Sequence, residues 1–268
     1  MNEIGDLKNR VALVTGSSSG IGAAIAKRLA QLGARVILHG RSDSQHLKES
    51  AQAVARFGAD TKTTVADFSD TNSIEPFIQS AWNQFGHIDI VVNNAGGDVL
   101  TGESTDWSFE EKLQYLLKTD VTATLMLSRR FGRQMIDHIQ NNDVQSPASI
   151  INIGWDQAYK GMAGDSGEMF ATTKGAIMSM TLSLAQSLAP SVRVNCVAPG
   201  WIKTDWGNQA SSDWDQRAIS ESLMNRWGQP EDVANMVSFL ASSQASFVSG
   251  QIINVNGGFR IFRDENEQ

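Results

Sequence analysis

The chain has 268 residues, of which 41% are apolar and 19% charged, a composition typical of a soluble globular protein. Its net charge of -7 and its pI near 5.1 argue against a nucleic-acid partner and against an anionic membrane surface. The single cysteine, Cys196, excludes an intrachain disulfide, and no apolar run reaches the ~20 residues of a membrane span. The polar segment Met1–Lys8 does not resemble a signal peptide, so we expect a cytoplasmic protein.

Short apolar runs alternate with longer segments of helical period along the chain. The runs predict buried strands at 11–15, 35–38, 63–66, 88–92, 149–153, 192–197 and 251–255. Helices are predicted at 20–32, 44–57, 72–85, 107–140, 168–189 and 231–242, with Asp70 and Asp106 as N-caps of the third and fourth and Pro230 at the start of the last. This alternation predicts one doubly wound α/β domain over residues 1–268, with a seven-stranded parallel sheet flanked by helices. Residues 201–229 interrupt the alternation and are expected to cross the carboxyl edge of the sheet as a lid.

Glycines cluster directly after the first predicted strand, in Thr15–Gly22. Glycine permits a tight turn there and lets backbone N–H groups approach a pyrophosphate at the start of the next helix. A plain strand–helix junction is the alternative, but the position between a first strand and a helix favours a dinucleotide site. The expected cofactor contacts in this turn are Gly16, Ser18, Ser19, Gly20, Ile21 and Gly22.

The end of the second predicted strand reads His39-Gly-Arg41-Ser42. A site for NAD usually places a carboxylate here for the ribose 2′-hydroxyl, whereas an arginine suits the 2′-phosphate of NADP. Arg41 and Ser42 therefore favour NADP(H) over NAD(H). Asp43 is the residue that argues the other way, and an ordinary surface position for Arg41 is the alternative.

The polar segments after two further strands are expected to contact the same cofactor. Asp67 and Phe68 follow the third strand and suit an adenine contact, and the small residues of Asn93–Gly96 let the backbone lie close to a ribose. Because the carboxyl ends of parallel strands share one edge of the sheet, these segments should meet there. The predicted contacts are Asp67, Phe68, Asn93, Ala95 and Gly96.

Four further segments, together with the glycine turn, complete a collinear set of motifs: Arg193–Asn195, Pro199–Thr204, Arg226–Ala234 and Gly250–Gly258. From about Lys8 to Gly258 the chain resembles the short-chain dehydrogenase/reductase family, and within it the 3-oxoacyl-carrier-protein reductases. The resemblance implies a nicotinamide cofactor and a homodimer or homotetramer built through the two long helices. It also implies cofactor contacts from Lys174, Pro199, Gly200, Ile202 and Thr204.

The family's active site is a tetrad of Asn, Ser, Tyr and Lys, and this chain matches only the last. By resemblance, Asp120 occupies the Asn position, Phe170 the Tyr position and Lys174 the Lys position. The Ser position falls at Trp155, or at Gly154 if the register shifts by one. A phenol is the usual proton donor, and loss of a general acid typically costs about 10²–10⁴-fold in rate.

Asp120 is the leading candidate for a substitute donor, acting through water, with a structural carboxylate as the alternative. The family's 2,4-dienoyl-CoA reductases look similar, since they lack the Tyr, keep the Lys and reduce a conjugated alkene. For four residues of the following loop a surface position is expected, with an inward-facing group as the alternative: Asp156, Tyr159, Ser166 and Glu168. Four tryptophans, with Trp155, either line a bulky apolar substrate pocket or pack the lid: Trp201, Trp206, Trp214 and Trp227.

The sequence thus predicts an NADP(H)-binding oxidoreductase with a non-standard proton donor that acts on a carbonyl or an activated alkene. The alternative is a cofactor-binding protein without catalysis that serves as a sensor or partner subunit. The expected partner is a small-molecule substrate, with no nucleic acid, no membrane and no metal.

Overall fold

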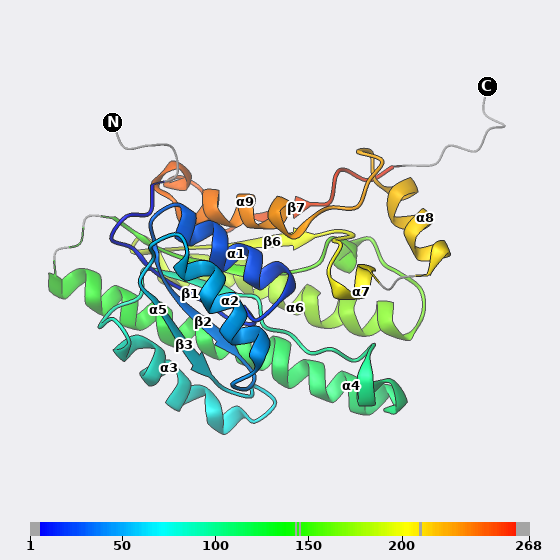
Figure 1. Ribbon diagram of the computed structural model, residues 1–268, viewed down its shortest axis with the longest axis horizontal. Helices are drawn as coiled ribbons and strands as arrows, with labels where there is room; N and C mark the ends of the chain where they lie inside the picture. The colour runs from blue at the N-terminus through cyan, green and yellow to red at the C-terminus, as the bar shows by residue number, and fades with distance from the viewer. Residues whose placement is uncertain (1–5, 143, 145, 209–210, 261–268) are drawn as a thin grey trace.

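All strands that the apolar runs predict are present in the computed structural model, which describes residues 6–142, 144, 146–208 and 211–260 (Figure 1). They pair in parallel, in the order β3-β2-β1-β4-β5-β6-β7, so the predicted seven-stranded parallel sheet is confirmed. Their bounds are β1 (Val11–Val14), β2 (Arg35–Gly40), β3 (Thr61–Val65), β4 (Ile90–Asn93), β5 (Ala148–Ile153), β6 (Val192–Pro199) and β7 (Ile252–Val255).

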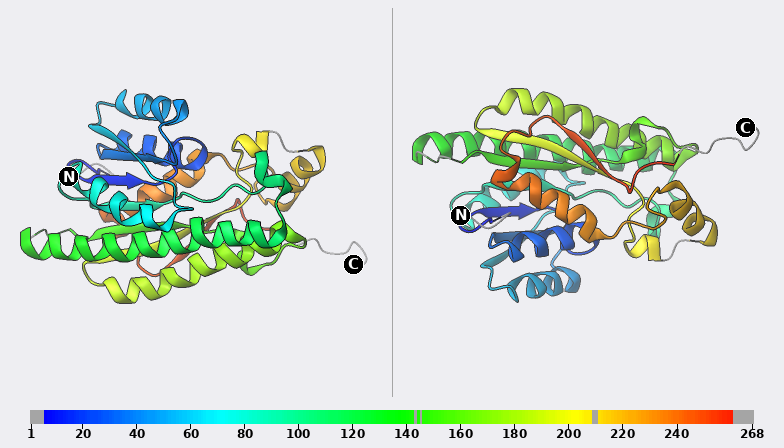
Figure 2. Two further views of the ribbon diagram at one scale, coloured as in Figure 1. Left: turned by 90° about the horizontal axis from the view of Figure 1, so that it is seen from below. Right: turned by 90° about the horizontal axis from the view of Figure 1, so that it is seen from above.

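Helices cover both faces of this sheet because successive strand side chains point to opposite faces. In β1, Ala12 and Val14 pack against one helical layer, whereas Val11 and Leu13 pack against the other. The first layer consists of α1 (Gly20–Gln31), α2 (Gln45–Ala55) and α9 (Pro230–Ala241). The second consists of α3 (Ile74–Asn83), α5 (Ala123–Asn142) and α6 (Asp165–Leu188), as Figure 2 shows. The central strands β1, β4 and β5 are therefore buried on both sides, as expected for a parallel sheet, whereas the edge strand β3 is largely exposed.

The helix predicted at 107–140 is not one regular helix. It consists of α4 (Phe109–Leu116), a π-helical segment at Leu117–Thr122 and α5, and a 3₁₀ turn at Gly102–Asp106 precedes it. The prediction that Asp106 caps this helix was wrong. Ser108 is the cap, because its hydroxyl accepts from the Glu111 N–H while the Glu111 carboxylate accepts from the Ser108 N–H.

The other two predicted helix starts are confirmed. Asp70 accepts from the Asn72 N–H and caps the turn at Thr71–Ser73 that leads into α3. Pro230 is the first residue of α9, where its missing N–H leaves no hydrogen bond unmade. Segment 201–229 holds two short helices, α7 (Asp205–Asn208) and α8 (Ser212–Glu221), which Figure 2 shows beyond the carboxyl ends of the strands.

The strand order reverses between β1 and β4, since β2 and β3 lie on one side of β1 and the remaining strands on the other. Loops that leave the carboxyl ends of these two strands diverge to opposite faces and open a crevice between them. Ligands of open α/β sheets bind at such a point. We therefore expect the ligand site to be formed by the loops that follow β1, β4, β5 and β6.

Candidate functional site

The glycine turn between β1 and α1 is a close-packed cradle. Gly16 and Gly20 have φ of 62° and 53°, a conformation that favours glycine. A Cβ on Gly22 would lie 2.2 Å from the Gly16 carbonyl oxygen and 2.5 Å from the Asn94 side-chain nitrogen. Ser19 precedes α1 without capping it through its side chain. The first N–H groups of α1 therefore face the crevice with no side-chain acceptor from their cap, which suits an anionic ligand.

His39, at the end of β2, holds this turn in place. Its Nδ1 accepts from the Gly16 N–H at 3.1 Å, and its Nε2 lies 3.0 Å from the Ala66 carbonyl oxygen, to which it donates. The ring stacks on Phe68 with the centroids 4.5 Å apart. Burial lowers the pKa of His39 to about 4, so the ring is neutral at pH 7. The sequence showed only a polar residue beside the cofactor-specificity position, and nothing in it indicated this structural role.

His39 should make stability fall on acidification. Its pKa is about 4 in the folded protein against about 6.5 when unfolded, so the unfolded chain binds the extra proton between these values. The free energy of unfolding should therefore drop by up to about 3 kcal/mol as the pH falls through this window. Urea unfolding at both ends of the window measures this. The His39→Gln variant, which cannot titrate, should lose less, and an equal loss in both proteins would contradict the assignment.

A cavity of about 630 Å³ opens over the turn. It contains most of the residues predicted to contact a cofactor: Gly16, Ser18, Ser19, Gly20, Ile21, Gly22, Arg41, Ser42, Asp67, Phe68, Ala95, Gly96 and Thr204. Lining residues that the sequence did not single out include His39, Ser44, His46, Asn94, Asp98, Tyr115 and Thr119. Most of these could have been found from their position just after a strand end. Tyr115 and Thr119 come from the next helix, and no pattern in the sequence indicates them.

Asn93 lies elsewhere than expected. Its side-chain nitrogen donates to the Ser128 hydroxyl and to the Asn152 oxygen, each at 2.9 Å, and the residue is buried between β4, β5 and α5. The neighbouring Asn94 reaches the cavity instead, where its side-chain nitrogen donates to the carbonyl oxygens of Thr15 and Gly16. Asn93 thus links β4 to β5 and α5, and Asn94 holds the glycine turn in place.

Arg41 lies in the wall of this cavity. His46 and Ser44, the N-cap of α2, line it as well. Asp43, the residue that argued against a phosphate, forms an ion pair with Lys48 at 3.0 Å and does not line the cavity. Arg41 therefore presents a positive charge to the cavity, which Asp67 also lines.

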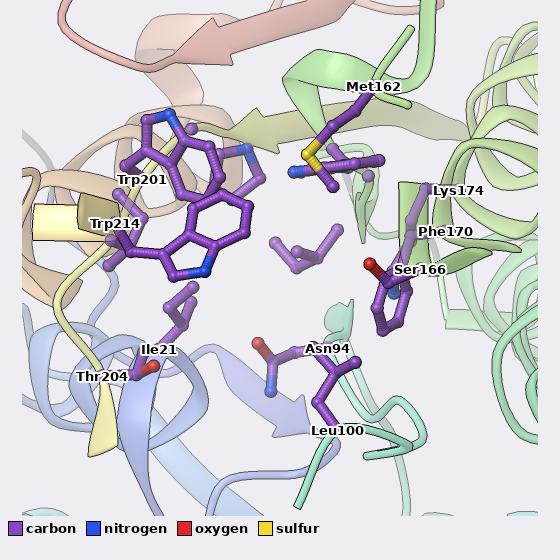
Figure 3. A pocket seen from close by; sticks show the side chains of 16 residues that line it. Ile21, Asn94, Leu100, Met162, Ser166, Phe170, Lys174, Trp201, Thr204 and Trp214 are labelled. Atoms are coloured by element: carbon purple, nitrogen blue, oxygen red, sulfur yellow. The ribbon is translucent and has the colours of Figure 1, made fainter. Parts of the chain in front are cut away.

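A second cavity, of about 540 Å³, adjoins the first, and Ile21, Asn94 and Thr204 line both. Its walls are mostly apolar, as Figure 3 shows. The lining includes the predicted residues Trp155, Phe170, Lys174, Pro199, Gly200 and Ile202. Met162, Ser166, Leu100 and Trp214 complete much of the surface. Trp155 and Phe170, the residues predicted at the Ser and Tyr positions, therefore face the same space as Lys174.

Asp120 and Lys174 form a buried ion pair, and Lys174 lines the second cavity. A Cβ on Gly96, which lines the first cavity, would lie 3.4 Å from the Lys174 Nζ. The Asp120 Oδ2 lies 2.8 Å from the Lys174 Nζ, and the carboxylate is only 1% exposed. Its Oδ1 accepts from the Gly97 N–H at 2.7 Å and from the Thr119 hydroxyl at 2.9 Å. All contacts of this carboxylate are thus with donors. These contacts anchor Lys174 and the loop after β4. In them the Asp120 carboxylate acts only as a hydrogen-bond acceptor.

Phe170 and Trp155 meet edge to face, with their ring centroids 6.2 Å apart. A Cβ on Gly154 would lie 2.8 Å from the Cys196 sulfur, so position 154 has no room for a side chain. Trp155 is therefore the first side chain after β5 that faces the cavity. Together the two rings, one after β5 and one on α6, form a continuous part of the cavity wall.

Asp156 is turned away from the cavity. It is buried, it accepts from the Asn256 side chain at 2.8 Å, and it pairs with Lys160 at 3.3 Å. Desolvation raises the pKa of Asp156, and its two partners oppose that rise. Its contacts tie the Trp155 loop to the segment after β7, which is a structural role.

Of the other loop candidates, only one reaches the cavity. Tyr159 is exposed and contacts Asn254, and Glu168 is exposed on α6. Ser166 lines the second cavity one helical turn before Phe170.

Tryptophans of segment 201–229 form the wall opposite α6. The ring of Trp201 lies 5.4 Å from that of Trp214 and 6.2 Å from that of Trp227, centroid to centroid. The Trp201 indole N–H donates to the Glu221 carboxylate at 2.8 Å. Trp201 and Trp214 line the cavity, whereas Trp227 packs behind them. The fourth predicted member, Trp206, lies outside the side chains that the structure describes.

Within residues 6–260, apart from the undescribed positions, no helix is long and apolar enough to cross a membrane. In the same part of the chain, His, Cys, Asp and Glu side chains form no group of three or more that could hold a metal ion.

A nucleotide-type cradle that opens onto an apolar cavity with a buried lysine defines the class of dinucleotide-dependent oxidoreductases. The model of the enoyl-(acyl carrier protein) reductase family matches residues 16–260. The 3-oxoacyl-(acyl-carrier-protein) reductase of Aquifex aeolicus is 36% identical, covering 94% of this chain and 98% of that protein. A 3beta-hydroxysteroid dehydrogenase of Eggerthella lenta is 33% identical, covering 96% of both. A solved 3-oxoacyl (acyl-carrier-protein) reductase from Agrobacterium tumefaciens, with NADP bound, superposes with a TM-score of 0.84 at 28% identity, covering 96% of this chain and 97% of that one.

These matches cover nearly the whole chain. The protein belongs to the short-chain dehydrogenase/reductase family and is an NAD(P)-dependent oxidoreductase. The relatives are named as reductases and dehydrogenases, and none of them supports the alternative of a cofactor-binding protein without catalysis.

Proposed function

We propose that this protein is an NADP(H)-dependent oxidoreductase that reduces a carbonyl or an activated alkene on a bulky apolar substrate, without a tyrosine as proton donor. The observation that carries the proposal is that the two cavities adjoin at Ile21, Asn94 and Thr204, with Lys174 in the wall of the second. One cavity has the form of a nucleotide site and the other is lined by aromatic rings. A substrate in the second would therefore face a nicotinamide held at the edge of the first.

The residues of the first cavity fit a dinucleotide. The cradle at Gly16 and Gly22 has no room for a side chain, and the start of α1 offers backbone donors for a pyrophosphate. Asp67 and Phe68 line the end suited to adenine, and Lys174 lies at the end suited to the nicotinamide ribose. Bound there, the cofactor would supply or accept a hydride.

NADP(H) is favoured over NAD(H) because Arg41 lines the cavity, whereas Asp43 in the same loop pairs with Lys48 and does not line it. Ser42, His46 and the start of α2 add donors around the same point. A related reductase has been solved with NADP bound, which agrees with this preference.

Replacing Arg41 with Ala should weaken NADPH binding by about 10-fold to 100-fold and leave NADH binding nearly unchanged, because only NADPH carries the 2′-phosphate. Titration calorimetry with each cofactor measures both affinities. The Arg56→Ala variant, at the exposed end of α2, serves as a control that removes the same charge outside the cavity. Equal losses for NADPH and NADH, or no loss for either, would contradict the phosphate assignment.

The substrate cavity favours flat, uncharged rings. Its walls include Trp155, Phe170, Trp201 and Trp214, and its charged group, Lys174, is paired with Asp120. Aromatic walls of this kind bind apolar rings by burial and by edge or face contacts. That a hydroxysteroid dehydrogenase is among the relatives agrees with a bulky substrate. The chain's own contribution is to bind the substrate, exclude water and hold Lys174 against the cofactor ribose.

Benzylideneacetone tests the reaction, because it is flat and apolar and carries both a ketone and a conjugated alkene. Incubation with NADPH, followed by chromatography of the products, should give the unsaturated alcohol if the enzyme reduces carbonyls and the saturated ketone if it reduces activated alkenes. Either product supports the proposal and selects between its two forms. Tetralone, a bicyclic ketone without the alkene, serves as the comparison. Failure to reduce either compound by enzyme that binds NADPH would contradict the proposed substrate class.

We also propose that the protein is a cytoplasmic homodimer or homotetramer built through α5 and α6. Leu125 on α5 and Leu182 on α6 are 36% and 43% exposed, which leaves apolar surface on both helices for a partner copy. The cytoplasm is proposed because it supplies the reduced cofactor.

A further inference from the structure

Ser166 occupies a distinctive position beside the missing phenol. It lies on α6 four residues before Phe170 and eight before Lys174, a spacing that places all three on one face of the helix. All three line the second cavity. In Figure 3 the Ser166 hydroxyl points into the cavity next to the edge of the Phe170 ring.

The Ser166 hydroxyl has no hydrogen-bond partner among the residues that the structure describes, whereas three other polar side chains of the cavity are occupied. The Asn94 side chain donates to the glycine turn, Lys174 is paired with Asp120, and the Trp201 N–H donates to Glu221. Thr204, the other hydroxyl that lines the cavity, lies on the opposite side beside Ile21 (Figure 3). Ser166 is thus a free donor on the wall that carries Lys174.

The alternatives are less suited to donate a proton. The Asp120 carboxylate already accepts from three donors and has none to offer. Phe170 has no polar atom, and Asp156 is turned toward Asn256 and Lys160. A substrate oxygen placed against α6 could therefore accept a hydrogen bond from Ser166, which lies one helical turn before Phe170, the predicted Tyr position.

We propose that Ser166 is a catalytic residue that donates a hydrogen bond and then a proton to the substrate oxygen, and this proposal rests on the oxidoreductase function proposed above. As the carbonyl carbon gains the hydride, the π-electron pair moves to the oxygen, which takes the proton from the Ser166 hydroxyl. A water molecule returns a proton to the serine oxygen, so the net reaction consumes one hydride and one solvent proton. Serine and an alkoxide product have similar basicity, so the main contribution is stabilisation of the developing negative charge.

Ser166→Ala should lower kcat for tetralone reduction by about 100-fold, the usual cost of losing one oxyanion donor. Ser166→Thr, which keeps a hydroxyl, should retain most of the activity. Ser187→Ala, at an exposed position of the same helix, is the matched control and should behave as wild type. NADPH affinity, measured by calorimetry, should be unchanged in all three variants because Ser166 does not line the nucleotide cavity.

The outcomes separate the two proposals. Wild-type turnover with an unchanged kcat in Ser166→Ala would overturn the role of Ser166 and leave the proposed function standing. A loss of kcat in Ser166→Ala that Ser166→Thr does not restore would also overturn it, since the hydroxyl would then not be the cause. Failure of the wild-type protein to reduce tetralone while it binds NADPH would instead overturn the proposed substrate class, and with it this inference.

Discussion

Replacing Asp120 with Ala is expected to destabilise the protein by about 3–5 kcal/mol, because it leaves the buried ammonium group of Lys174 without its counter-charge. The carboxylate is 1% exposed and the lysine side chain 16%, so solvent compensates little. The substitution also removes the acceptor of the Gly97 N–H, which fixes the loop after β4. Equilibrium urea unfolding of the wild-type and variant proteins measures the difference.

An exposed pair of the same residue types provides the control. Lys203 and Asp215 lie 3.5 Å apart and are 37% and 42% exposed, so Asp215→Ala should cost at most about 1 kcal/mol. Adding Lys174→Met to Asp120→Ala should recover part of the stability, since no unpaired charge would remain. A similar small effect of Asp120→Ala and Asp215→Ala would show that the buried pair does not hold the site together.

Replacing Gly22 with Ala is expected to abolish tight NADPH binding and to destabilise the fold by several kcal/mol. The added methyl group would lie 2.2 Å from the Gly16 carbonyl oxygen and 2.8 Å from the Gly16 carbonyl carbon. These are rigid backbone atoms of the cradle, and overpacking of this kind costs about 1–3 kcal/mol or more. Thermal unfolding with and without NADPH measures both effects, and the stabilisation by the cofactor should disappear.

Gly175→Ala is the matched control, because the position lies inside α6 and nothing is within 4 Å of the added methyl. Alanine is the better helix former by about 1 kcal/mol, so this variant should be as stable as the wild type or more so. If Gly22→Ala bound NADPH as the control does, the cradle would not be the pyrophosphate site.

The sheet and the cradle were predictable because local patterns encode them. The run 11–15 places apolar side chains on both faces of the strand, and glycine recurs where the chain must turn tightly at Gly16 and Gly20. The break in the long helix at Leu117–Thr122 was not predictable, since residues 107–140 keep a helical apolar period across the π-helical segment. Asp and Ser are both favourable N-cap residues, so the sequence does not distinguish Asp106 from Ser108. In the structure Ser108 is the cap because it forms reciprocal hydrogen bonds with Glu111.

Most residues predicted for the site line one of the two cavities, but their contacts could not be predicted. Lys174 and Asp120 were expected near each other, but the sequence could not show that three donors surround the carboxylate. His39 was missed because a buried neutral histidine depends on partners from two distant loops. Ser166 seemed a surface residue because nothing in the loop sequence shows that α6 begins at Asp165, which brings its hydroxyl onto the face of Phe170.

Transfer of deuterium from NADPH labelled at the nicotinamide C4 is the most direct test of the central claim, that this site transfers hydride without a phenol. The wild-type protein, incubated with labelled NADPH and benzylideneacetone, should give a reduced product that carries deuterium on carbon, as measured by mass spectrometry. Unlabelled, unreduced benzylideneacetone recovered from protein saturated with NADPH would contradict the account.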